Sequence, residues 1–158
     1  MSLDAHVRCT CLRDGKAKPH PLAKRLTVDE SGEPMLSGDP TDEEWDQHDQ
    51  WLSEMCEHSG FLVTEFLGNI TRVGNIRSFL KGLQGKPGPR FRILLQKVVC
   101  DGTHTGDWIP RDETAALMEE VDTVLHSSDI LSEGEKEFFG SMKTLCEASL
   151  KTGNPIVF

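Results

Sequence analysis

The sequence has no apolar run that approaches the ~20 residues needed for a helix to cross a bilayer. Its first residues also lack the basic start and apolar stretch of a secretory signal. Ser2 excludes N-myristoylation, and the last four residues, Pro155 to Phe158, contain no lipid-anchor motif. We therefore expect a soluble cytoplasmic protein that does not bind membranes.

Motifs that would name a reaction are missing as well. The chain contains neither a Gly-x-Ser-x-Gly elbow nor a His-Glu-x-x-His pair. The glycines of residues 82–88 are interrupted by proline and lack the Gly-Lys-Ser/Thr ending of a phosphate loop. We therefore expect no catalytic residues, and we predict a protein that acts by binding rather than by turnover.

Positive charge is absent from a long central stretch. Between Leu26 and Thr71 the chain has twelve carboxylates and neither lysine nor arginine, whereas Arg72–Lys97 has seven bases and no acid. The formal net charge is -9. Such an acidic block attracts a basic partner and repels nucleic acid and anionic lipid. A solvated acidic helix face is the alternative interpretation. We expect the basic stretch to neutralise the acidic one inside the fold.

Cysteine occurs five times, an odd number that argues against a disulfide framework in a chain without an export signal. Two pairs, Cys9-x-Cys11 and Cys56-x-His58, carry the soft donors that bind tetrahedral zinc. Residues two apart on a strand point the same way, so the pairs can converge on one ion. Both spacings are one residue shorter than the usual C-x2-C knuckle. Small buried thiols of a core strand are therefore the alternative.

The best-marked helix begins after Thr41, which forms a capping box with Glu44, and it should extend to about Glu57. Its apolar residues gather on one side, and carboxylates cover the rest. We expect this acidic surface, with two aromatic anchors, to bind the partner. The predicted partner-binding residues are Asp42, Glu43, Trp45, Asp46, Asp49, Trp51 and Glu54.

The whole chain is expected to form one domain over 1–158, with a loop-rich segment over 14–40. Strands are predicted over 5–12, 25–28 and 61–67, and further helices from 70, 110 and 132. Residues 91–99 are apolar on both faces toward their end and are predicted to form a central strand. These elements indicate an α+β or α/β fold, in which a sheet of three to four strands packs with about four helices as a single layer sandwich.

Residues 101–108 form a turn-rich segment that contains His104 between Asp101 and Asp107. A histidine beside carboxylates can act as a base or a ligand. Ordinary turn chemistry explains the same residues, and no second motif supplies a catalytic partner for His104. We favour the structural interpretation.

Three segments together resemble a group of small uncharacterised bacterial proteins: the opening Cys-Thr-Cys-Leu-Arg-Asp-Gly-Lys of residues 9–16, Cys56-Glu57-His58, and the turn of residues 101–107. In size and acidity the chain is similar to immunity proteins of polymorphic toxin systems. That resemblance implies a cytoplasmic inhibitor of a cognate toxin with a basic groove, such as a nuclease or a nucleic-acid deaminase. It assigns no role to any residue. A small zinc-dependent enzyme and a zinc-stabilised structural domain are the alternatives.

The thiols are predicted to be reduced, because an odd number of cysteines without an export signal leaves no disulfide framework to form. Titration with a thiol reagent in denaturant and chelator should find all five thiols free. A lower count that chelation does not restore would reveal a disulfide and contradict this expectation.

Overall fold

Alternation along the first strand places one face of a sheet in the core. The computed structural model describes residues 2–83, 91–101, 106–126 and 128–158, which form an α+β fold. Leu3, Ala5 and Val7 are buried, whereas the residues between them point to the other face. The sheet is antiparallel, with strand order β4-β1-β6-β5. Its strands are β1 (Ser2–Arg8), β4 (Phe61–Asn69), β5 (Trp108–Ile109) and β6 (Ile156–Val157).

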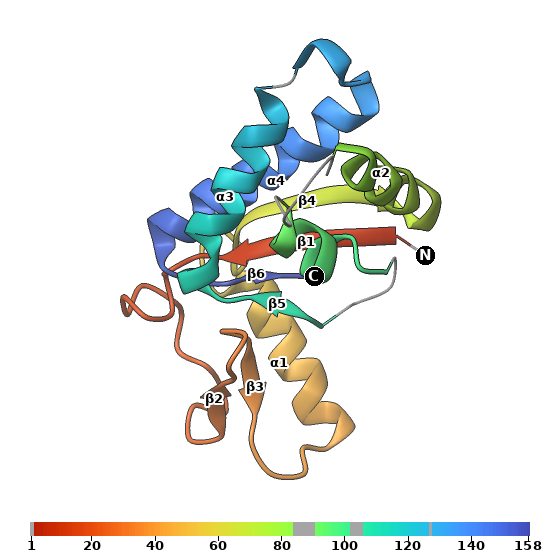
Figure 1. Cartoon of the computed structure of the whole chain (residues 1–158). Coiled ribbons are helices and arrows are strands. Elements are labelled where there is room, and N and C mark those ends of the chain that lie inside the picture. Colours follow the sequence, from red (N-terminus) through yellow and green to blue (C-terminus); the bar gives the residue numbers. More distant parts are fainter. Residues whose placement is uncertain (1, 84–90, 102–105, 127) are drawn as a thin grey trace.

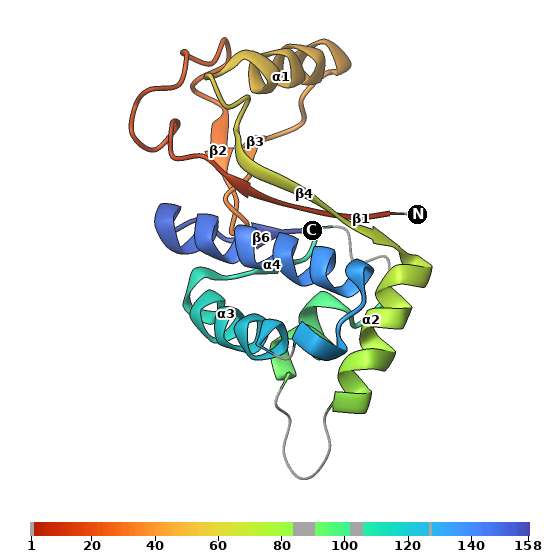
Figure 2. The ribbon, with the colours of Figure 1, turned by 90° about the horizontal axis from the view of Figure 1, so that it is seen from above.

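Three α-helices cover the buried face of the sheet (Figure 2). Helix α4 begins at a capping box of Ser132 and Glu135 and ends at Gly153, whose φ of 75° suits a residue without a side chain. The structure confirms the predicted starts of all three helices. They are α2 (Ile70–Leu83), α3 (Arg111–Leu125) and α4 (Glu133–Thr152). No described helix combines the length and the apolar character that crossing a membrane requires.

Residues 9–60, which we call the α1 lobe, form a long insertion between the paired strands β1 and β4 (Figure 1). The lobe lies on the side of the sheet opposite α2, α3 and α4 (Figure 2). No described residue of the lobe belongs to the main hydrophobic cluster. Its own buried apolar residues are few, so other contacts must hold it. Its elements are β2 (Leu26–Val28), β3 (Pro34–Leu36) and α1 (Asp42–Glu54), and β2 pairs with β3.

The predicted central strand over 91–99 is wrong. Residues 92–98 are helical, and Leu94–Val98 within them forms a π-helix, η1. A short run that is apolar all round does not distinguish a buried strand from a buried helix. The carboxylate of Glu120 in α3 accepts hydrogen bonds from the backbone N–H groups of Ile93 and Leu94. These N–H groups lie at the start of the helical segment and have no acceptor within it.

Two predicted boundaries also need correction. Strand β1 ends at Arg8, so Cys9 and Cys11 lie in the loop that follows it rather than on a strand. Helix α1 has the predicted capping box but ends at Glu54. Strand β4 begins at the predicted residue, and the short strand around 25–28 is confirmed as β2.

Among the described residues no ion pair joins the acidic stretch to the basic one, contrary to the prediction. Arg72 and Lys97 form ion pairs with Glu137 and Glu113 of the C-terminal helices. Lys86 and Arg90 lie outside the described residues. Where the structure describes an ion pair between the acidic stretch and a lysine or arginine, the base lies earlier in the chain. These pairs are Glu33 with Arg8, Glu44 with Arg25 and Glu54 with Lys18.

Buried polar side chains hold α1 against the rest of its lobe. The indole Nε1 of Trp51 donates a hydrogen bond to the carbonyl of Lys18 at 2.9 Å. His20 Nδ1 accepts from the Leu22 backbone N–H at 2.8 Å, so its Nε2 must be the protonated nitrogen that donates to His48 Nδ1 at 3.0 Å. His48 Nε2 then donates to the carbonyl of Pro34 at 3.1 Å. Both imidazoles are neutral in this chain of hydrogen bonds.

Acid should therefore weaken the α1 lobe. Burial and the neighbouring His48 lower the pKa of His20 below its ordinary value of 6.5. Because the unfolded chain binds the proton more readily, stability is complete above pH 6.5 and is lost as the pH falls below it. Urea unfolding followed by tryptophan fluorescence at about pH 7.5 and about pH 5.5 should show this loss. His48→Gln should reduce the pH dependence of the free energy of unfolding, and His126→Gln should not. Equal pH dependence in the wild type and both variants would contradict the role of the His20–His48 hydrogen-bond relay.

Candidate metal centre

Four donor side chains meet at the base of the α1 lobe. Cys9 and Cys11 follow β1 directly, and Cys56 and His58 lie between α1 and β4. Antiparallel pairing sets Arg8 opposite Phe61, and the Cys9 backbone N–H donates to the Gly60 carbonyl at 3.1 Å. The two ends of the lobe are therefore side by side, which brings the predicted donors together although they are 47 residues apart in sequence.

The spacing of the donors suits a tetrahedral ion. The Cys9 and Cys56 sulfurs are 3.6 Å apart, and the Cys11 sulfur is 3.4 Å from His58 Nδ1. All four donor atoms lie within 4.8 Å of one another. Zinc bonds of about 2.3 Å to sulfur and about 2.0 Å to nitrogen in a tetrahedron require donor separations of roughly 3.4–3.8 Å. The cluster can therefore hold a metal ion with little rearrangement.

The thiols of the cluster differ in acidity. Burial and the neighbouring thiols raise the pKa of Cys11 to about 12. At Cys56, burial acts in the same direction, but hydrogen bonds from the Gly60 and His58 backbone N–H groups outweigh it and lower the pKa to about 7. Because a metal binds thiolates, filling the site must release the proton that Cys11 otherwise holds.

The backbone around the cluster is fixed by tight turns. The Cys11 carbonyl accepts from the backbone N–H groups of Lys16 and Ala17, which folds the segment after β1 back on itself. On the other side, Ser59 and Gly60 have φ values of 48° and 83°, and this left-handed turn lets the chain leave α1 and enter β4. A hollow of about 270 Å³ opens beside the donors and is lined in part by Lys16, Glu57 and Lys151. It offers an ion a route to the site.

The predicted partner-binding carboxylates are exposed on α1, and most are unpaired. Asp42, Glu43, Asp46 and Asp49 have no basic group within 4.0 Å among the residues that the structure describes. Glu54 lies 3.8 Å from Lys18 in an exposed ion pair. A row of unpaired carboxylates on one helix produces a negative potential that salt screens only partly at short range.

The two predicted aromatic anchors differ in how far they are exposed to solvent. Trp45 is half-buried, and its ring lies edge-on to His48 with centroids 5.7 Å apart. Trp51 is only 6% exposed and packs inside the lobe, so its prediction as a partner-binding residue is wrong. Its position between His48 and Met55 at helical spacing already marked it as part of the apolar stripe.

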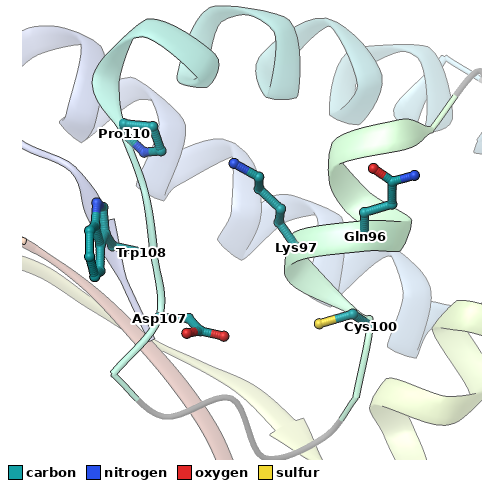
Figure 3. A pocket seen from close by; sticks show the side chains of 6 residues that line it. All are labelled: Gln96, Lys97, Cys100, Asp107, Trp108 and Pro110. Carbon is teal, nitrogen blue, oxygen red and sulfur yellow. The ribbon is translucent and has the colours of Figure 1, made fainter.

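Sequence reasoning missed a second hollow, of about 380 Å³, beside η1 (Figure 3). Its lining includes Lys97, Cys100, Asp107 and Trp108. The hollow depends on the helical conformation of residues 92–98. Because a strand was predicted there, the hollow could not be predicted from the sequence. Lys97 is held by Glu113 at 2.6 Å. His104, which the sequence placed in this region, lies outside the described residues.

Sequence reasoning also missed the buried Arg8. Its guanidinium pairs with Glu33 of the loop before β3, and its Cζ atom lies 4.7 Å from the centre of the Phe61 ring. Arg8 therefore joins the end of the sheet to the α1 lobe beside the donor cluster.

Comparison of the chain with family models, with curated protein sequences and with solved structures gives no match. The assignment of function therefore rests on the geometry.

The donor cluster is expected to bind one zinc or cobalt ion per chain. Cobalt should give the visible absorption of a tetrahedral thiolate site, because three sulfurs and one nitrogen surround the ion. Elemental analysis of the zinc protein gives the stoichiometry. Cys11→Ser should lower the affinity at least about tenfold.

Cys100→Ser is the matched control, since Cys100 is a free thiol outside the cluster. Equal affinity in Cys11→Ser and Cys100→Ser, or an octahedral cobalt spectrum, would show that the cluster is not the binding site.

Proposed function

We propose that this chain is a zinc-stabilised immunity protein, which binds and inhibits a cognate bacterial toxin through the acidic surface of α1. The observation that carries the proposal is a row of exposed, unpaired carboxylates on a helix that buried contacts hold in place. An acidic helix that served only solubility would need no such anchoring. A helix fixed in one orientation can instead present its charges to a partner without a large entropic cost.

Zinc is the metal that the donors favour. Three thiols and one imidazole are soft ligands, whereas magnesium and calcium require oxygen. Four protein donors complete a tetrahedron and leave no position for a substrate or water, which is the pattern of structural zinc sites. The ion would therefore stabilise the lobe rather than take part in a reaction, and the protein would act without turnover.

The partner is proposed to be a protein with a basic surface. A net charge of -9 opposes direct binding to nucleic acid, and the α1 carboxylates attract lysine and arginine at long range. Toxins that cleave or deaminate nucleic acids need a basic groove for their substrate, and an acidic protein can occlude it. Reduced thiols at the metal centre suit the cytoplasm, where such an inhibitor would act.

The proposal is tested by protection of cells. Toxin candidates taken from the reading frames beside the gene are co-expressed with the chain, and growth is measured with the wild type and with Asp42→Asn/Glu43→Gln/Asp46→Asn. The triple variant should lose protection, because removing three steering charges slows association by roughly tenfold and weakens its salt dependence.

The control Glu119→Gln/Asp129→Asn/Glu147→Gln removes the same charge from exposed residues of α3, η2 (Ser128–Ile130) and α4. It should protect like the wild type. Absence of protection by the wild type, or equal protection by both variants with unchanged binding rates, would overturn the proposed function.

A further inference from the structure

The sheet has an open face beneath the α1 lobe. Asp4 and His6 point away from the core, because they alternate with the buried residues of β1. Phe66 is paired with Asp4 and is 59% exposed. Phe61, at the other end of β4, is 38% exposed, and its ring packs edge-on to His6 with centroids 4.7 Å apart. Two aromatic rings thus lie on a face that the helices leave uncovered.

Helix α1 forms the opposite wall of a cleft above this face. A hollow of about 380 Å³ lies at its base, between Arg8 and Phe61 of the sheet and Asp49, Leu52 and Ser53 of α1. From this base the backbones of α1 and β4 diverge toward the start of α1 (Figures 1 and 2).

The carboxylates of α1 are not equivalent with respect to the cleft. A helix advances 100° per residue, so Asp42, Asp46 and Asp49 form one stripe together with Ser53. Asp49 and Ser53 line the hollow, which shows that this stripe borders the cleft. Glu43 and Glu54 lie roughly 100° further around the helix and face away from it. Helix α1 therefore carries its own matched set of control residues.

The cleft is negative at its base. Among the described residues, Arg8 is the only base that lines the hollow, and its ion pair with Glu33 neutralises it, which leaves the charge of Asp49.

We propose that the basic partner docks in this cleft, with lysine or arginine side chains on the Asp42, Asp46 and Asp49 stripe and an apolar side chain against Phe61 and Phe66. The inference rests on the proposed function and adds the place of binding. The partner segment must combine positive charge with an apolar anchor, because one wall is acidic and the other aromatic.

The probe is a fluorescein-labelled peptide of alternating lysine and leucine, whose binding is followed by fluorescence anisotropy at low salt. Asp46→Lys/Asp49→Lys should weaken binding at least tenfold, whereas Glu43→Lys/Glu54→Lys, with the same change of net charge, should weaken it less than about threefold. Phe66→Ser should also weaken binding, because it removes the exposed apolar wall while keeping every charge. Circular dichroism and melting temperature verify folding, and Asp46→Asn/Asp49→Asn replaces the lysine variant if it does not fold.

Equal weakening by the two lysine pairs would overturn docking in the cleft but leave the acidic surface as the binding surface. Binding unaffected by either pair would overturn both the cleft and the acidic-surface proposal. An unchanged affinity of Phe66→Ser would also contradict the cleft, since a purely electrostatic contact needs no apolar wall. The failure of the inference and the failure of the proposed function are therefore distinguishable.

Discussion

The antiparallel pairing of β1 with β4 is the constraint on which the rest of the α1 lobe depends. It fixes the two ends of residues 9–60 side by side and thereby assembles the donors Cys9, Cys11, Cys56 and His58 at the base of the lobe. The lobe needs such a closure, because its buried apolar residues are few and separate from the main core. A neutral hydrogen bond such as that of Trp51 contributes about 0.5–1.5 kcal/mol. Zinc ligation in small domains contributes about 10–16 kcal/mol.

This arrangement connects the metal centre to the acidic surface. Cys56 follows α1 after a single residue, so an ion held by it would fix the C-terminal end of the helix. The His20–His48 relay and the capping box fix the rest. The Asp42, Asp46 and Asp49 stripe would then keep one orientation above the open face of the sheet. Without the ion, the end of α1 next to Cys56 would lose this restraint, and ordering it would oppose binding.

Much of the fold was predictable from local sequence signals. The capping boxes at Thr41 and Ser132 gave helix starts that the structure confirms, since each satisfies backbone N–H groups within a few residues. The short strands β5 and β6 were not predicted, because two residues carry no periodicity and their pairing depends on distant chain segments. The strand predicted over residues 91–99 was wrong for another reason. Their helical form depends on Glu120, which lies in a different element.

The sequence identified the residues of the candidate site, but it did not predict the backbone structure that brings them together. The four donors were identified by their chemistry, whereas the expected geometry placed Cys9 and Cys11 on a strand that ends at Arg8. Trp51 was expected at the surface because aromatic anchors are frequent at interfaces, yet it packs inside the lobe, where its indole donates to the carbonyl of Lys18. The roles of Arg8 and of the open sheet face depend on tertiary contacts that no local pattern reveals.

Hydrogen–deuterium exchange of the zinc-loaded protein, before and after chelation, tests the central claim most directly. If the ion closes the base of the lobe, chelation should abolish protection in residues 9–60 and leave β1, β4 and α4 protected, because the main core contains no residue of the lobe. Restoring zinc should restore the protection. Unchanged protection of residues 9–60 after complete removal of zinc would contradict the account, as would a loss of protection that spreads evenly over the whole chain.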